Sequence, residues 1–228
     1  MKPSTPASSA ETQGWLAPSL SMKPVPGSAT KVLRVRRPAP SYDCPMTVRR
    51  VLWERTDVPG FEWCELGQDT AGDTWLGVAL LAWEGEPYRV SYRIGLDSAR
   101  LTRRVSIVSE GPGPAVVLEL EADGRGTWRR DGAIVIESPG ALDVDLGFSP
   151  STNSLPIRRL ELAIGDVREI EVAWVLFPSF EVQLGRQTYE RLGERTWRYR
   201  SVGFEADLTV DEDGLVDAYA EWRAVARG

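Results

Sequence analysis

The sequence predicts an all-β fold: a many-stranded antiparallel sheet that rolls on itself into a barrel-like shape. From Tyr42 onward, apolar and polar residues alternate with a period of two, which is typical of strands with one buried face. Asp-Gly pairs at 123–124, 131–132 and 213–214 favour tight hairpins between such strands. With 42% hydrophobic residues among 228, the chain can also bury a sizeable core.

The strand segments follow one another along most of the chain. The clearest are Val90–Leu96, Leu101–Ile107, Val116–Leu120, Leu160–Ile164, Ile170–Leu176, Trp197–Tyr199 and Phe204–Val210. Hairpins join most of them, so the sheet is expected to be antiparallel. A long sheet of this kind has to close or roll to avoid open edges.

A local helix signal lies at residues 149–153. Ser149 suits the N-cap position and Pro150 the first helical position. Pro156 and the alternation of Leu155, Ile157 and Arg159 favour an extended chain soon afterwards. The helix should therefore be short.

Residues 1–42 are expected to form a disordered basic tail rich in proline and serine, and residues 43–228 a single domain. The tail has six basic residues against one acidic residue, a net charge of +5, so the total of −6 leaves −11 on the rest. Such an acidic domain has no electrostatic reason to bind nucleic acid. No secretory signal or transmembrane stretch is recognisable, and the expected location is cytoplasmic.

The residue types that are missing exclude much chemistry. The chain has no histidine, and its three lysines lie in the tail. This excludes serine–histidine and cysteine–histidine nucleophile pairs, histidine-ligated metals and a Schiff base in the domain. Cys44 and Cys64 are expected to be reduced. We therefore expect no enzyme, no cofactor and no metal.

The segment from Pro139 to Gly165 is the candidate site. Asp143 and Asp145 are two residues apart, so on a strand they share one face at roughly 7 Å. Like charges at this spacing raise a carboxyl pKa, and the distance also falls in the range of inverting glycosidases. Alternatively, one aspartate bonds to amides of the following turn and the other pairs with Arg158 or Arg159.

Polar groups after the aspartates extend this candidate site. Thr152 and Asn153 supply neutral donors and acceptors, which suit hydroxyl groups. Arg158 and Arg159 should point to opposite faces, so that one of them joins the aspartates. Arg159 shares its face with Leu155 and Ile157 and would need a carboxylate or a polar headgroup as partner. Eight tryptophans of the domain offer aromatic surface to line a cavity in the roll.

The same segment carries a longer motif that continues in the flanking strands. It reads Asp143-x-Asp145-Leu146, Ser149-Pro150-x-Thr152-Asn153-x-Leu155-Pro156-Ile157-Arg158-Arg159-Leu160 and then Gln187-x-Tyr189. Together with Pro59-Gly60-x-Glu62 before it and Asp211-x-Asp213-Gly214 after it, the pattern covers residues 47–225 in order. It resembles the bacterial glycolipid-binding family of spiral β-roll proteins.

This resemblance implies a sheet rolled around a single helix, a tendency to form homodimers, and a shape similar to lipoprotein localisation factors. It implies non-enzymatic binding of an amphiphile, a glycolipid or lipid precursor. The candidate ligand-binding residues are Asp143, Asp145, Thr152, Asn153, Arg158, Arg159, Gln187 and Tyr189.

Two other functions stay open on the sequence. One is a glycoside hydrolase that uses Asp143 and Asp145 as acid and base. The other is a dimeric interaction scaffold without a small ligand.

Overall fold

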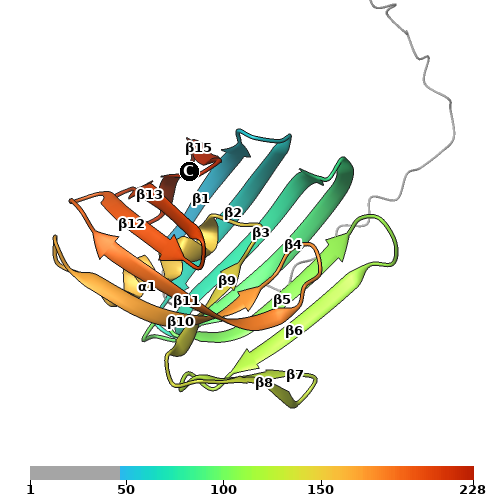
Figure 1. The fold of residues 1–228 in the computed structure, drawn as a ribbon, viewed down its shortest axis with the longest axis horizontal. Helices are drawn as coiled ribbons and strands as arrows, with labels where there is room; N and C mark the ends of the chain where they lie inside the picture. Colours follow the sequence, from blue (N-terminus) through green and yellow to red (C-terminus); the bar gives the residue numbers. More distant parts are fainter. Residues whose placement is uncertain (1–46) are drawn as a thin grey trace, which may run out of the picture. The chain divides into compact units, whose positions relative to one another are not determined.

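The computed structural model describes residues 47–228, which form one 15-stranded sheet that curls around a short helical segment (Figure 1). The expectations for the tail and for Cys44 lie outside these residues. Within them the all-β fold with a rolled sheet is confirmed, and the single α-helix of this part of the chain lies on the concave side of the sheet.

The strands fall into two runs separated by the helical segment. The first run is β1 (Thr47–Arg55), β2 (Gly60–Asp69), β3 (Gly72–Trp83), β4 (Glu86–Leu96), β5 (Thr102–Glu110), β6 (Val116–Ala122), β7 (Thr127–Arg130), β8 (Ala133–Glu137) and β9 (Ala141–Leu146). A 3₁₀ turn (Ser151–Asn153) and α1 (Ser154–Leu160) follow. The second run is β10 (Val167–Val175), β11 (Val182–Arg191), β12 (Thr196–Ser201), β13 (Phe204–Val210), β14 (Val216–Tyr219) and β15 (Trp222–Arg227).

The sheet joins these runs through β1 and β15, in the order β8 to β1 and then β15 to β9. All neighbouring strands pair antiparallel, as expected, except β9 and β10, which are parallel. This exception follows from the helical crossover between them. The segment that contains α1 leads the chain back to the level of the first residue of β9, so β10 starts at the same end as β9 and runs in the same direction. The Asp-Gly pairs lie in the turns after β6, β7 and β13, and Gly124, Gly132 and Gly214 have positive φ there.

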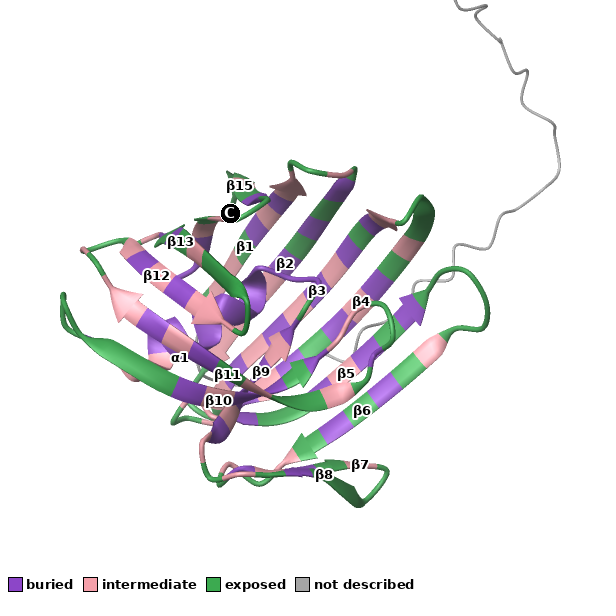
Figure 2. Cartoon of the chain, viewed as in Figure 1, coloured by how far each residue is buried: buried purple, intermediate pink, exposed green. Residues whose placement is uncertain are grey.

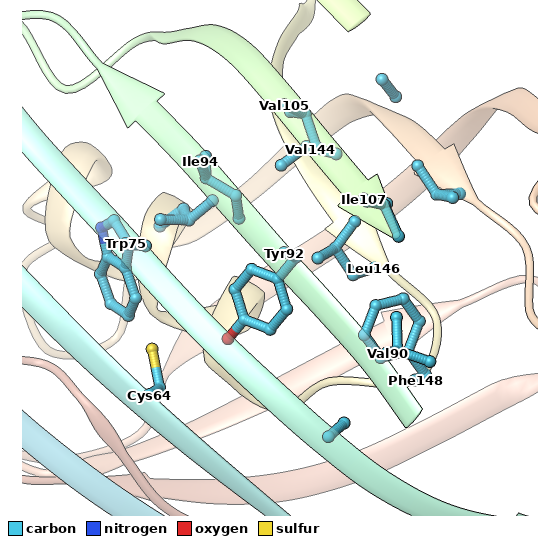
Figure 3. Packing of buried hydrophobic residues seen from close by; sticks show 14 of the residues in the cluster. Cys64, Trp75, Val90, Tyr92, Ile94, Val105, Ile107, Val144, Leu146 and Phe148 are labelled. Carbon is cyan, nitrogen blue, oxygen red and sulfur yellow. The ribbon is translucent and has the colours of Figure 1, made fainter. Parts of the chain in front are cut away.

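Buried and exposed residues alternate along the strands (Figure 2), which confirms the period-two pattern. The inward residues of β2 to β5 and of β9 belong to one buried cluster, in which Val144 and Leu146 lie beside Val105 and Ile107 of β5 (Figure 3). β9 is thus an edge strand of the sheet that is also folded into the core. Its aspartates are carried inside with it.

The helix is longer than the sequence indicated. Residues 154–160 are helical, so Pro156 and Arg159 lie in α1 and not in an extended chain. Pro156 is the third residue of α1, where backbone amides have no intrahelical acceptor, so its missing N–H costs nothing. The strand expected at Leu160–Ile164 is wrong: Leu160 ends the helix, Glu161 has a left-handed φ of 47°, and the next strand begins at Val167.

The helix is tied to strands that are distant in sequence. The hydroxyl of Ser154 accepts a hydrogen bond from the amide of Val216 on β14. Arg158 forms an ion pair with Asp73 on β3, and both side chains are buried. The indole of Trp53 on β1 donates to the carbonyl of Val216, which links the first strand to the same region.

Gly77 should be required for packing inside the roll. It lies opposite Tyr92 in the β3–β4 register, and a methyl group at position 77 would overlap the Tyr92 ring. We expect Gly77→Ala to lower the free energy of unfolding by about 1–3 kcal/mol in urea denaturation. Gly95→Ala on β4 is the control, because its Cβ would meet open space. Equal effects of both substitutions would contradict this account.

Candidate functional site

A cavity of about 800 Å³ lies beside the C-terminal end of β9. Its walls come from β9 to β15, from the segment between β9 and α1, and from the ends of β1 and β3. The lining residues are Arg55, Trp83, Asp145, Leu146, Gly147, Ser149, Asn153, Trp174, Gln183, Leu184, Gly185, Arg186, Gln187, Tyr199, Ser201, Val202, Phe204, Tyr219, Ala220, Glu221 and Trp222. Three of the expected ligand-binding residues, Asp145, Asn153 and Gln187, are among them.

Asp145 is the charged group in the polar part of this cavity. Its carboxylate accepts a hydrogen bond of 2.6 Å from the amide nitrogen of Gln187 and a long one, 3.5 Å, from the hydroxyl of Thr152. Burial raises its pKa to about 6, although both hydrogen bonds lower it. Within residues 47–228 no arginine lies within 4.0 Å of it. At neutral pH the cavity therefore contains a carboxylate without a counter-ion.

Tyr189 orients the amide groups behind the cavity. Its hydroxyl lies 2.8 Å from the carbonyl oxygen of Asn153 and 3.3 Å from that of Gln187, and donates toward both. The amide nitrogen of Gln187 is thereby directed to Asp145, and the amide nitrogen of Asn153 remains to donate elsewhere. Tyr189 itself is buried and does not line the cavity. Like Thr152, it lies behind the surface that a ligand could touch.

Aromatic rings form much of the remaining wall. Tyr199, Phe204 and Tyr219 contact one another edge to face or tilted, with centroids 5.7–6.1 Å apart. Trp174 lies on β10 opposite Asp145 in the parallel register. Gly147 and Gly185 leave room for this indole, since added Cβ atoms would lie 3.2–3.3 Å from Trp174 atoms. The cavity thus combines apolar ring surface with oriented polar groups.

Asp143 is separate from this cavity, although it shares a strand face with Asp145. It is fully buried and accepts three hydrogen bonds of 2.6–3.2 Å from the guanidinium of Arg159. Burial raises its pKa, and Arg159 opposes that shift. Asp143 is therefore part of an internal ion pair, which is one of the alternatives left open by the sequence.

The two arginines of α1 have different surroundings. Arg159 lines a second cavity of about 730 Å³, together with Arg168, Glu169, Glu171 and other residues. Arg158 pairs with Asp73 at 2.9 Å and lies over the ring of Trp75 at 5.7 Å. One arginine, Arg159, pairs with one of the β9 aspartates, Asp143, and it does so from a helix and not from an extended chain.

A buried group that sequence reasoning did not select is Glu62 on β2. Its Oε1 accepts hydrogen bonds from the hydroxyls of Tyr92 (2.5 Å) and Ser149 (2.7 Å), and the hydroxyl of Ser151 lies 2.7 Å from Tyr92. Its Oε2 has no hydrogen-bond partner within residues 47–228. Burial raises the pKa of Glu62 to about 7, although these hydroxyls lower it. The alternation of β2, which places Glu62 on the face of buried Cys64 and Leu66, could have identified it.

The two aspartates of β9 do not face one common cavity. A pair of catalytic carboxylates has to reach one substrate, but Asp143 is enclosed by Arg159 and does not line the cavity of Asp145.

Among residues 47–228 there is no group of three cysteine, aspartate or glutamate side chains that could hold a metal ion. None of the helices in the same range is long and apolar enough to cross a membrane.

Glu62 should make stability depend on pH. Its folded pKa of about 7 lies above the ordinary glutamate value of 4.5, so between these two pH values the folded state holds a proton that the unfolded state has lost. The protonated carboxyl group therefore contributes to the free energy of unfolding at low pH, and this contribution is lost as pH rises to about 7. One pKa unit corresponds to about 1.4 kcal/mol. Between pH 4.5 and 8, the free energy of unfolding of wild type should therefore fall by roughly 3 kcal/mol relative to that of Glu62→Gln.

Urea unfolding across this pH range measures the effect of Glu62. Glu65→Gln, a substitution at a partly exposed position of the same strand that pairs with Arg50, is the control. A constant difference between Glu62→Gln and wild type at every pH would show that folding does not raise the pKa of Glu62.

The ion pair of Asp143 and Arg159 should be structural. We expect Arg159→Met to lower the free energy of unfolding by about 3–5 kcal/mol, because it leaves the Asp143 charge buried without a partner. The double variant Asp143→Leu/Arg159→Met should lose less, since no charge remains. Chemical denaturation of both variants tests this, and a double variant that is less stable than the single one would contradict it.

Comparison with known proteins agrees with the fold. The chain matches the model of a family described as "Putative glycolipid-binding" over residues 50–224. A crystal structure of a DUF1089 family protein from Pseudomonas aeruginosa is 34% identical, has a TM-score of 0.63, and is matched over 70% of this chain and 89% of that chain. A beta-barrel-like protein of domain DUF1849 from Brucella abortus is 8% identical with a TM-score of 0.46, over 80% of this chain and 95% of that chain.

No curated protein matches the chain. The family model covers most of the described sheet, from β1 into β15, and includes the cavity, α1 and both aspartates. The chain therefore belongs to the family described as putative glycolipid-binding.

Proposed function

We propose that this protein binds an amphiphile, a glycolipid or a lipid precursor, in the 800 Å³ cavity beside β9 and does so without catalysis. The observation that carries the proposal is the composition of this cavity. Six aromatic residues line it, and Asp145, Gln187 and Asn153 provide oriented polar groups. Ring faces suit the C–H surfaces of sugars and acyl chains, and oriented amides suit hydroxyl groups.

The size and the rigidity of the cavity support binding. Its volume lies within the range of roughly 300–1,000 Å³ that is usual for small-molecule sites. The polar groups are held in place by Tyr189, which is buried behind them. A ligand would therefore meet groups that are already oriented, which lowers the entropic cost of binding.

The residues that we propose to contact the ligand are Asp145, Asn153 and Gln187, with Thr152 and Tyr189 holding them in position. We propose structural roles for Asp143, Arg158 and Arg159, because each of them is engaged in a buried or half-buried ion pair. The cytoplasmic location and the homodimer stay predictions.

Ligand retention should depend on the aromatic wall. We expect Phe204→Ala to weaken binding of a glycolipid-like probe, dodecyl maltoside, by about tenfold, because it removes ring surface from the cavity. Phe61→Ala is the matched control: Phe61 is similarly exposed, at 47% against 39%, but does not line the cavity. Tryptophan fluorescence titration measures both affinities.

Native mass spectrometry of the purified protein, followed by organic extraction, tests the proposal directly. A stoichiometric amphiphile that is lost from the Phe204→Ala variant and kept by the Phe61→Ala variant is the expected result. Absence of any bound amphiphile, together with no dodecyl maltoside binding, would overturn the proposed function.

A further inference from the structure

We propose that Asp145 and the rings of Tyr199, Phe204 and Tyr219 form a subsite for an organic cation, a protonated amine or quaternary ammonium group on the polar part of the ligand. This inference rests on the proposed function, because it specifies the chemistry of a ligand in the same cavity. It follows from the charge balance of the cavity and from the kind of groups that surround its carboxylate.

The two aspartates of β9 provide an internal comparison. Asp143 is neutralised by a bidentate contact with Arg159. Asp145, two residues later on the same face, receives hydrogen bonds from the neutral groups of Gln187 and Thr152 alone among residues 47–228. Neutral donors solvate a carboxylate without cancelling its charge. The second aspartate thus lacks the cation that the first one has.

The other charged groups around the cavity do not supply this cation. Arg55 is held by Asp57 through two hydrogen bonds of 2.7–2.8 Å, and its guanidinium lies over the ring of Trp222. Arg186 lies 3.4 Å from Glu171. Glu221 adds a second negative charge at the rim, with no arginine of the described chain within 4.0 Å. The net charge of the lining with its ion-pair partners is therefore negative.

The aromatic residues near Asp145 are suited to a cation. Tyr199, Phe204 and Tyr219 are in mutual contact and all line the cavity. Burial raises the pKa of Tyr199 and Tyr219, and the charge of Asp145 adds to the shift of both. A ring face attracts a cation through its quadrupole, and a nearby carboxylate adds a direct charge interaction.

Headgroups other than a cation would not compensate the negative charge of Asp145. A neutral sugar can donate hydrogen bonds to Asp145, but the carboxylate remains uncompensated. A phosphate or sulfate would meet the carboxylates of Asp145 and Glu221, while Arg55 and Arg186 of the same lining are engaged with Asp57 and Glu171. An ammonium group, alone or on an amino sugar, can both compensate the carboxylate and contact the rings.

Two probes with the same chain separate these cases. Dodecyltrimethylammonium and dodecyl maltoside, each below its micelle concentration, are titrated into the full-length protein at neutral pH by calorimetry. We expect the ammonium probe to bind about tenfold more tightly than the maltoside. Asp145→Asn, which keeps an oxygen for the Gln187 amide, should reduce this ratio to within about threefold.

Glu137→Gln is the control variant, because it removes one negative charge from an exposed position of β8 that does not line the cavity. It should keep most of the preference, and circular dichroism checks that each variant is folded. Equal binding of both probes to wild type, or a preference that survives in Asp145→Asn, would overturn the cation subsite while the proposed function stands. Binding of neither probe would overturn both.

Discussion

Much of this structure depends on one constraint: the polar segment between β9 and α1 lies inside the apolar roll and needs hydrogen-bond partners there. The chain leaves β9, passes through Ser149 to Asn153 and continues into α1 on the concave side of the sheet, where water is largely excluded. Buried polar groups without partners are costly, so the surrounding strands have to supply hydrogen-bonding side chains. Glu62 on β2, Asp73 on β3 and Asp143 on β9 do so at three separate places.

The candidate site follows from how this requirement is met along β9. Asp143 lies where α1 can reach it, so Arg159 compensates its charge. Asp145 lies beyond the reach of the helix and next to the open cavity, where an amide and a hydroxyl are its hydrogen-bond donors. The spacing of two residues places both carboxylates on one face, but it does not give them the same surroundings. This difference separates a structural aspartate from one that is available to a ligand.

The sequence could predict the sheet because alternation and Asp-Gly turns are local signals. It could also place Asp145, Asn153 and Gln187 in one group through a shared motif. The partners of α1 could not be predicted in this way, because Asp73 and Arg158 are 85 residues apart and meet only when the sheet rolls. The length of the helix could not be predicted for a related reason. Proline opposes the interior of a helix but not its first turn, and Pro156 lies in the first turn of α1 because the buried 3₁₀ turn ends at Asn153.

The buried glutamate shows how a polar group can serve the fold without serving the ligand. Glu62 lies behind Ser149, and Ser149 lines the cavity, so the hydroxyl stands between the carboxyl group and any bound molecule. A carboxyl group that stays protonated near neutral pH carries no net charge into the core and still orients two hydroxyls. Burial raises the pKa of Asp145 as well, but Asp145 faces the cavity directly. Of Glu62, Asp143 and Asp145, only Asp145 lines the cavity, and this access makes it the group to which a ligand would respond.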